Sequence, residues 1–217
     1  MTGSARRLTT PDGVELALHR IRAYRDGRPA VLLVHGAFTN HRFWLHAGMA
    51  HFLGAAGLCW LARVAAAAPI RAIVTLGTPG PRRLGPVRRT LAAATMAVSR
   101  LLGRFPARSL RFGNEDEAAE IIAEWMEWNV RGRWLGMDGF DYFAGLAALS
   151  TPYLGVAGGA DWIFAPPRAC RQVVERVGGA NKKLAVEPGL SHRGLVLSER
   201  ARLSCWPNVV AWLKETL

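Results

Sequence analysis

Short apolar runs separated by helical segments are the feature that most restricts the fold of this chain. Ala30–Val34, Ala72–Leu76 and Tyr153–Ala157 lack the alternation of a strand with one exposed face. Such runs are typical of strands buried on both faces, which occur in parallel sheets covered by helices. Helical segments are expected at 86–103, 167–177 and 205–213. This order predicts an α/β fold with a mostly parallel sheet and helices on both faces.

Two further elements complete the expected core. Arg7 to Arg22 alternates around a Pro-Asp-Gly turn and predicts a β-hairpin. Leu184–Val186 predicts another strand, between the last two helical segments. The core is therefore expected to comprise residues 1–80 and 150–217.

The long stretch from 81 to 149 has no strand character and predicts a helical cap inserted over the sheet. Its first helix is expected between Pro86 and Gly103, because proline suits the first turn and glycine suits a stop. Helical spacing places four residues of this helix on one face: Leu91, Thr95, Val98 and Leu102.

A second cap helix is expected to start at Asn114, with Glu117 three residues later as in a capping box. Its buried face is expected to hold Ala118, Ile121, Ile122, Trp125 and Trp128. A stripe of glutamates lies opposite, whereas residues 81–111 hold eight arginines and no acid. The two helices either pair through these charges or expose them to water, and the sequence leaves both open.

Composition restricts the function classes. A chain of 217 residues suits one compact domain. The net charge of +12 divides as +6 in 1–80, +2 in 81–128 and +4 in 129–217. Because nucleic-acid binders usually concentrate their charge on one face, this even spread argues against nucleic acid as a partner.

Location and cofactors are inferred from what the sequence lacks. No apolar run suggests a secretory signal or a transmembrane segment. The three cysteines, Cys59, Cys170 and Cys205, lack metal-type spacing and suit buried thiols in a reducing compartment. We therefore expect a cytoplasmic protein with no metal and no cofactor.

Three segments together resemble the α/β-hydrolase superfamily, specifically its lipase- and esterase-like members with a helical cap. "VLLVHGAFTNHRFW" resembles the strand and oxyanion loop, and "LGVAGGADWIFAP" resembles the strand and loop that present the triad acid. "LAVEPGLSHRGLVLSERARLSCWPNVVAWL" resembles the loop and last helix that present the triad histidine. The likeness covers nearly the whole chain and implies a small ester or acyl compound as substrate.

The resemblance assigns roles to three residues. Asp161 would orient His192, whose second ring nitrogen would act as general base, and the backbone N–H of Ala37 would be an oxyanion donor. The acid precedes the histidine by 31 residues, in the order that the superfamily shows. Without the resemblance, each residue has an alternative interpretation. Asp161 could be a turn residue ahead of Pro166, and His192 could be a loop histidine with no catalytic role.

The nucleophile of the superfamily is missing. None of the seven serines lies in a Gly-x-Ser-x-Gly elbow, so the nucleophile is unknown. At Trp60–Leu61 a strand-like segment runs directly into a helix-like one, where the resemblance implies a further βαβ unit with the central strand and elbow. We therefore expect the strand at 30–35 to neighbour the one at 71–76, with 42–68 as the helical crossover.

The sequence leaves three functions open. The first is an ester or acyl hydrolase by descent that is impaired or inactive. The second is an active ester hydrolase with an unrecognised nucleophile. The third is a non-catalytic protein that binds an acyl or anionic ligand. We also expect Asp161 and His192 to lie within hydrogen-bond reach, and exposed apolar patches to favour self-association.

Overall fold

The computed structural model describes residues 4–9, 15–20, 70–111, 115–136 and 138–217. The chain divides into two compact units, residues 1–32 and residues 33–217. The predicted strand at 30–34, the oxyanion donor Ala37, and the junction at Trp60–Leu61 with its crossover all lie outside the described residues.

The first unit contains the predicted hairpin. Strands β1 (Ser4–Thr9) and β2 (Glu15–Arg20) pair antiparallel. The register joins Ser4 to Arg20 at one end of the pair and Thr9 to Glu15 at the other. The hairpin prediction is confirmed.

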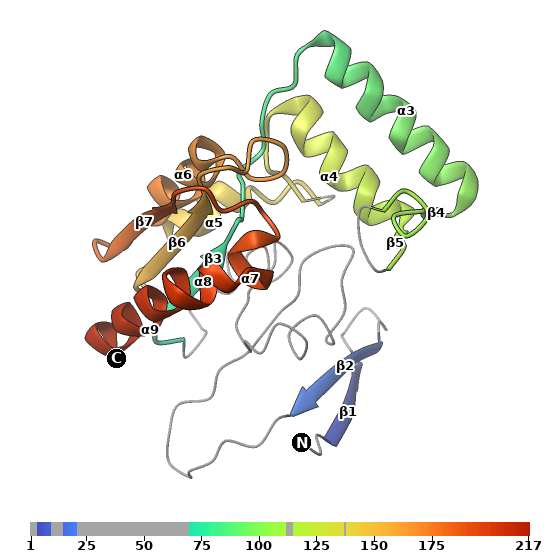
Figure 1. The fold of residues 1–217 in the computed structure, drawn as a ribbon. Helices are drawn as coiled ribbons and strands as arrows, with labels where there is room; N and C mark the ends of the chain where they lie inside the picture. Colours follow the sequence, from blue (N-terminus) through green and yellow to red (C-terminus); the bar gives the residue numbers. More distant parts are fainter. Residues whose placement is uncertain (1–3, 10–14, 21–69, 112–114, 137) are drawn as a thin grey trace. The chain divides into compact units, whose positions relative to one another are not determined.

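The described sheet of the second unit has three parallel strands in the order β3-β6-β7 (Figure 1). They are β3 (Ile73–Leu76), β6 (Tyr153–Gly158) and β7 (Lys182–Glu187). All six residues of β6 are buried, because β6 has a paired strand on each side and helices over both faces. The strands predicted at 72–76, 153–157 and 184–186 and their parallel arrangement are confirmed.

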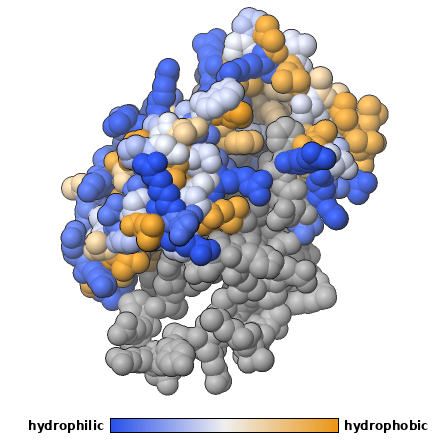
Figure 2. All heavy atoms as spheres, in the orientation of Figure 1, coloured by the Kyte–Doolittle hydropathy of each residue, from blue (hydrophilic) through white to orange (hydrophobic). Residues whose placement is uncertain are grey.

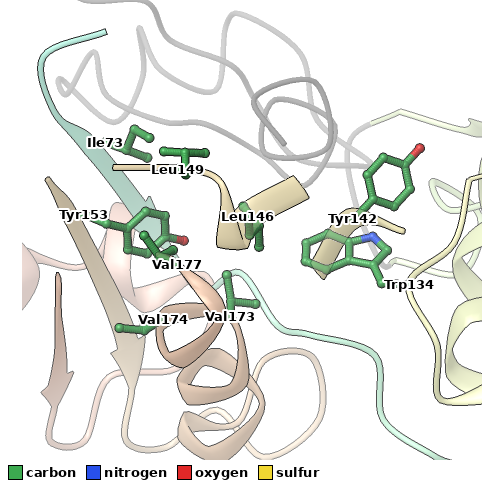
Figure 3. Packing of buried hydrophobic residues seen from close by; sticks show 9 residues of the cluster. All are labelled: Ile73, Trp134, Tyr142, Leu146, Leu149, Tyr153, Val173, Val174 and Val177. Atoms are coloured by element: carbon green, nitrogen blue, oxygen red, sulfur yellow. The ribbon is translucent and has the colours of Figure 1, made fainter. Parts of the chain in front are cut away.

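One face of the sheet packs against α5 (Tyr142–Ala147) and α6 (Pro167–Arg176). Ile73 and Tyr153 contribute from the strands, and Val173 from α6 (Figure 3). The phenol oxygen of Tyr153 shares a 2.8 Å hydrogen bond with Oγ1 of Thr75, which satisfies both buried hydroxyls.

The opposite face packs against the C-terminal helices α7 (Gly194–Leu197), α8 (Glu199–Leu203) and α9 (Cys205–Thr216). Leu154 and Val156 point to this side because successive residues of a strand face opposite ways. The expected layer arrangement, with helices on both faces, is therefore present.

The segment between β3 and β6 carries a helical hairpin. It contains α3 (Pro86–Leu102), the two-residue strands β4 (Arg104–Phe105) and β5 (Glu117–Ala118), and α4 (Ala119–Arg131). Helix α3 starts and ends where the sequence predicts: Pro86 is its first residue, and Gly103 ends it in the left-handed conformation at φ 66°.

Two expectations for this hairpin are wrong. The second helix begins at Ala119 and not just after Asn114, because Glu117 and Ala118 pair with Arg104 and Phe105 as β5 and β4. Ala118 and Ile121 are exposed, whereas Ile122 is buried as predicted. Tertiary pairing here overrides the local capping pattern.

Candidate functional site

The candidate site lies where two neighbouring strands end. The loop after β6 carries Asp161, and the loop after β7 carries His192. Backbone hydrogen bonds join the loops: Gly159 N–H donates to Glu187 O at 2.8 Å, and Ala160 N–H donates to Leu190 O at 3.0 Å. A Cβ atom on Gly158 would collide with the Leu190 carbonyl, so this close approach requires glycine.

The Asp161 carboxylate is held by three hydrogen bonds. The backbone N–H of Phe164 donates to Oδ1 at 3.0 Å, and that of Ala165 donates to Oδ2 at 3.0 Å. Nδ1 of His192 lies 2.8 Å from the same Oδ2. The predicted contact between Asp161 and His192 is present, and so is the alternative role of Asp161 as a turn residue.

His192 is oriented by its surroundings. Its ring lies against Phe164, with ring centroids 5.4 Å apart, and against the backbone of Gly77 at the end of β3. The side chain is 38% exposed. Within the described part of the chain, no hydrogen-bond partner is found at Nε2, the nitrogen that would act as base.

The carboxylate of Asp161 favours its charged form. Burial by itself raises the pKa of this carboxyl, but the hydrogen bonds from His192, Ala165 and Phe164 and the positive charge of His192 outweigh burial. The net pKa lies below the ordinary value. A charged Asp161 accepts a hydrogen bond from Nδ1–H of His192. Whenever the ring is neutral, this tautomer leaves Nε2 as its acceptor nitrogen.

Arg82 connects the helical hairpin to the loop that carries Asp161. Its Nη2 donates to the carbonyl of Ile163 at 2.6 Å, and its backbone N–H donates to Oδ1 of Asn129 at 3.1 Å. Asn129 is buried in α4. Burial lowers the pKa of Arg82, and the Asp161 carboxylate acts in the opposite direction.

The described cysteines are poor candidates for a nucleophile. Burial, with a contribution from the charge of Asp161, raises the pKa of Cys170 to about 12. Burial, with a contribution from the charge of Glu187, raises the pKa of Cys205 to about 12. A thiol with such a pKa carries almost no thiolate near neutral pH.

No metal centre is assigned: within the described ranges, no group of three or more His, Cys, Asp or Glu side chains is placed to hold a metal ion. The helices in those ranges are all too short or too polar to cross a bilayer.

Comparison with known proteins bears on the fold. No protein-family model matches the sequence, and no curated protein matches it. The soluble variant of monoglyceride lipase from Saccharomyces cerevisiae, solved with a substrate analog, superposes with a TM-score of 0.52 at 14% identity. That match covers 80% of this chain and 64% of the lipase. The chain has the α/β-hydrolase fold.

Two other solved structures are similar at lower scores. The monoacylglycerol lipase of Paleococcus ferrophilus gives a TM-score of 0.49 at 15% identity, over 76% of this chain and 67% of that one. An esterase from Exiguobacterium antarcticum gives a TM-score of 0.47 at 15% identity. That match covers 72% of this chain and 62% of the esterase. The chain thus spans about two thirds of the length of these hydrolases.

Two residues of this site were not predicted from the sequence. Gly77 lies against the His192 ring. The one sequence feature that could have pointed to it is its position directly after a predicted strand. Arg82 reaches the Asp161 loop over 81 residues of sequence, and nothing distinguished it from the neighbouring arginines. Both contacts depend on how distant segments meet, which local patterns do not encode.

Proposed function

We propose that the chain is an ester- or acyl-hydrolase-type protein that keeps the acid and the histidine of a triad and lacks the serine nucleophile. In this proposal Asp161 and His192 are the remnant of the triad, and Ala37 is the remaining oxyanion donor. Its ligand is a small ester or acyl compound. Its ester hydrolysis is close to the uncatalysed rate.

The observation that carries the proposal is the pairing of His192 with Asp161. Nδ1 lies 2.8 Å from Oδ2, and two backbone N–H groups hold the carboxylate in place. This is the base-and-orienter arrangement of a hydrolytic triad. A histidine that is only a loop residue needs no such arrangement.

The proposed loss of activity rests on the sequence. No Gly-x-Ser-x-Gly motif occurs in the 217 residues. The serine next to the base, Ser191, accepts a hydrogen bond at Oγ from the backbone N–H of Gly194 at 3.2 Å, which makes it part of the loop turn. A base without a nucleophile leaves only weak activation of water, so turnover is expected to be small.

Labelling with a fluorophosphonate probe tests the proposal, because the probe forms a covalent bond with activated serines. The purified full chain and His192→Ala are treated in parallel, with a serine esterase as positive control. We expect no labelling of either variant. Labelling of the unmodified chain that disappears in His192→Ala would show an active nucleophile and contradict the proposal. Peptide mapping would then identify the serine.

A further inference from the structure

Arg82 brings a partly buried positive charge to the loop that carries Asp161. Its Nη2 donates to the carbonyl of Ile163 at 2.6 Å, but a guanidinium has several further N–H donors. Among residues 70–111, 115–136 and 138–217, no second hydrogen bond from this guanidinium and no ion pair with a carboxylate is found. The bond to Ile163 therefore leaves most of the donors of Arg82 without a described partner.

The surroundings of Arg82 do not neutralise its charge. Burial lowers the pKa of the guanidinium, and the positive charge of Arg88 lowers it further. The carboxylate of Asp161 acts in the opposite direction and contributes less than Arg88. The oxygens of that carboxylate already accept three hydrogen bonds. Because a cation that is partly removed from water is stabilised by a charged hydrogen-bond partner, Arg82 is suited to bind an anionic group of a ligand.

The loop that Arg82 contacts also holds the ring of His192. Ile163, which accepts the hydrogen bond from Arg82, directly precedes Phe164. The Phe164 ring lies against the His192 ring, with centroids 5.4 Å apart. Two consecutive residues of one loop thus contact the guanidinium and the imidazole. A ligand beside His192 therefore has a positive charge close by.

This loop exposes apolar side chains as well. Trp162 is 71% exposed and Ile163 49%. Exposure alone does not select a ligand site, because Figure 2 shows hydrophobic residues, in orange, at several places on one face of the molecule. What distinguishes this loop is that apolar side chains, a cation and a base occur together. Such a combination is complementary to a ligand with an apolar chain and an anionic end.

We propose that Arg82 binds the carboxylate of an acyl ligand whose ester group lies beside His192. This inference rests on the proposed function, in which the ligand is a small ester or acyl compound. It adds that the ligand carries a carboxylate at the end away from the ester, as a half-ester of a dicarboxylic acid does. Trp162 and Ile163 contact the carbon chain between the two groups.

NMR titration of the full chain with two ketones tests the proposal. A ketone has the carbonyl group of an ester and cannot be hydrolysed. The two probes are 7-oxooctanoate, which ends in a carboxylate, and 2-octanone, which has a methyl group in its place. Acetate is titrated separately, because a site for any small anion would bind it as well. The ring resonances of His192 and the dissociation constants are the readouts.

The test variant is Arg82→Gln. Its amide keeps an N–H donor for the carbonyl of Ile163 and removes the positive charge. The control is Arg83→Gln, the same change at the neighbouring arginine, which is exposed. Binding of 2-octanone verifies that the site of each variant is intact.

We expect the unmodified chain and Arg83→Gln to bind 7-oxooctanoate about tenfold more tightly than 2-octanone, because hydrogen bonds between charged groups are the stronger ones. Arg82→Gln should bind both ketones equally, with the affinity that the unmodified chain has for 2-octanone. No preference for 7-oxooctanoate in the unmodified chain, or an unchanged preference in Arg82→Gln, would overturn the proposal. Acetate binding as tight as that of 7-oxooctanoate would also overturn it.

The outcome of this titration does not depend on a nucleophile, since neither ketone is hydrolysed. Fluorophosphonate labelling tests the missing nucleophile separately. An active serine together with a preference for 7-oxooctanoate would therefore contradict the proposed function and leave the role of Arg82 in place. Unlabelled protein without that preference would do the reverse.

Discussion

Gly77 lies so close to the imidazole of His192 that a Cβ atom at residue 77 would be 2.8 Å from Nδ1. Nδ1 is the atom that meets Asp161, so any side chain at residue 77 competes with that hydrogen bond. The backbone conformation also requires glycine, since φ is 58°. The end of β3 thus fixes where the histidine ring can lie.

We expect Gly77→Ala to displace the His192 ring and to destabilise the fold by about 1–3 kcal/mol, from backbone strain together with the lost contact. Gly103→Ala is the matched control. Gly103 has a similar φ of 66° but nothing within 4 Å of a Cβ, so it reports backbone strain alone. Urea unfolding and the His192 ring resonances measure the two effects. Equal unfolding energies and unchanged ring resonances would contradict the role of Gly77.

The lowered pKa of Asp161 predicts a pH dependence of stability. In the unfolded chain an aspartate has a pKa of about 3.9. A group whose folded pKa is depressed stabilises the fold fully above its unfolded pKa and loses this contribution as pH falls through the folded pKa. We therefore expect Asp161→Asn to be less stable than the unmodified chain at pH 7, and the difference to shrink below about pH 4.

Urea unfolding at several pH values measures this difference. Glu175→Gln, at an exposed position of α6, serves as control for the loss of one carboxylate. A difference between Asp161→Asn and the unmodified chain that stays constant from pH 7 to pH 3 would show that the charge of Asp161 contributes nothing to the fold.

The buried thiols of Cys170 and Cys205 should resist modification. With pKa values raised to about 12, both remain protonated at neutral pH. In a Cys59→Ser variant, we expect Ellman's reagent to leave both thiols unmodified in the folded protein and to modify two per chain after unfolding in urea. Rapid modification of either thiol in the folded protein would contradict this expectation and would make that cysteine a candidate nucleophile.

Arg82 should stabilise the loop that carries Asp161. Its bond to the Ile163 carbonyl lies next to Phe164 and Ala165, whose N–H groups hold the carboxylate. We expect Arg82→Ala to increase amide hydrogen exchange at residues 164 and 165 by about tenfold, the equivalent of about 1.4 kcal/mol. The control is Arg171→Ala, an exposed arginine of α6. Equal amide hydrogen exchange at residues 164 and 165 in both variants would show that Arg82 does not stabilise this loop.

Much of the core could be predicted from the sequence because its signals are local. The apolar run at Tyr153 marks a strand buried on both faces, and Pro86 and Gly103 mark the limits of α3. The contact of Asp161 with His192 was expected because the resemblance to α/β-hydrolases puts both residues on loops after the last two strands, which pair with each other.

The rest depends on tertiary contacts. Nothing in the local pattern shows that Leu91 and Val98 face water, because an apolar stripe looks the same whether it is buried or exposed. The start of α4 moved to Ala119 because β4 and β5 pair across the hairpin. The short helix α5 went unpredicted; the exposed side chain of Asp141 caps it by accepting hydrogen bonds from the backbone N–H groups of Phe143 and Ala144.

Hydrolysis of a p-nitrophenyl ester tests whether the Asp161–His192 pair lacks a nucleophile, as proposed. The unmodified chain, His192→Ala and Asp161→Asn are compared with buffer alone, at equal protein concentration. We expect all three to release p-nitrophenol at nearly the rate of buffer. Turnover by the unmodified chain that is lost in both variants would contradict it and would show a complete catalytic site.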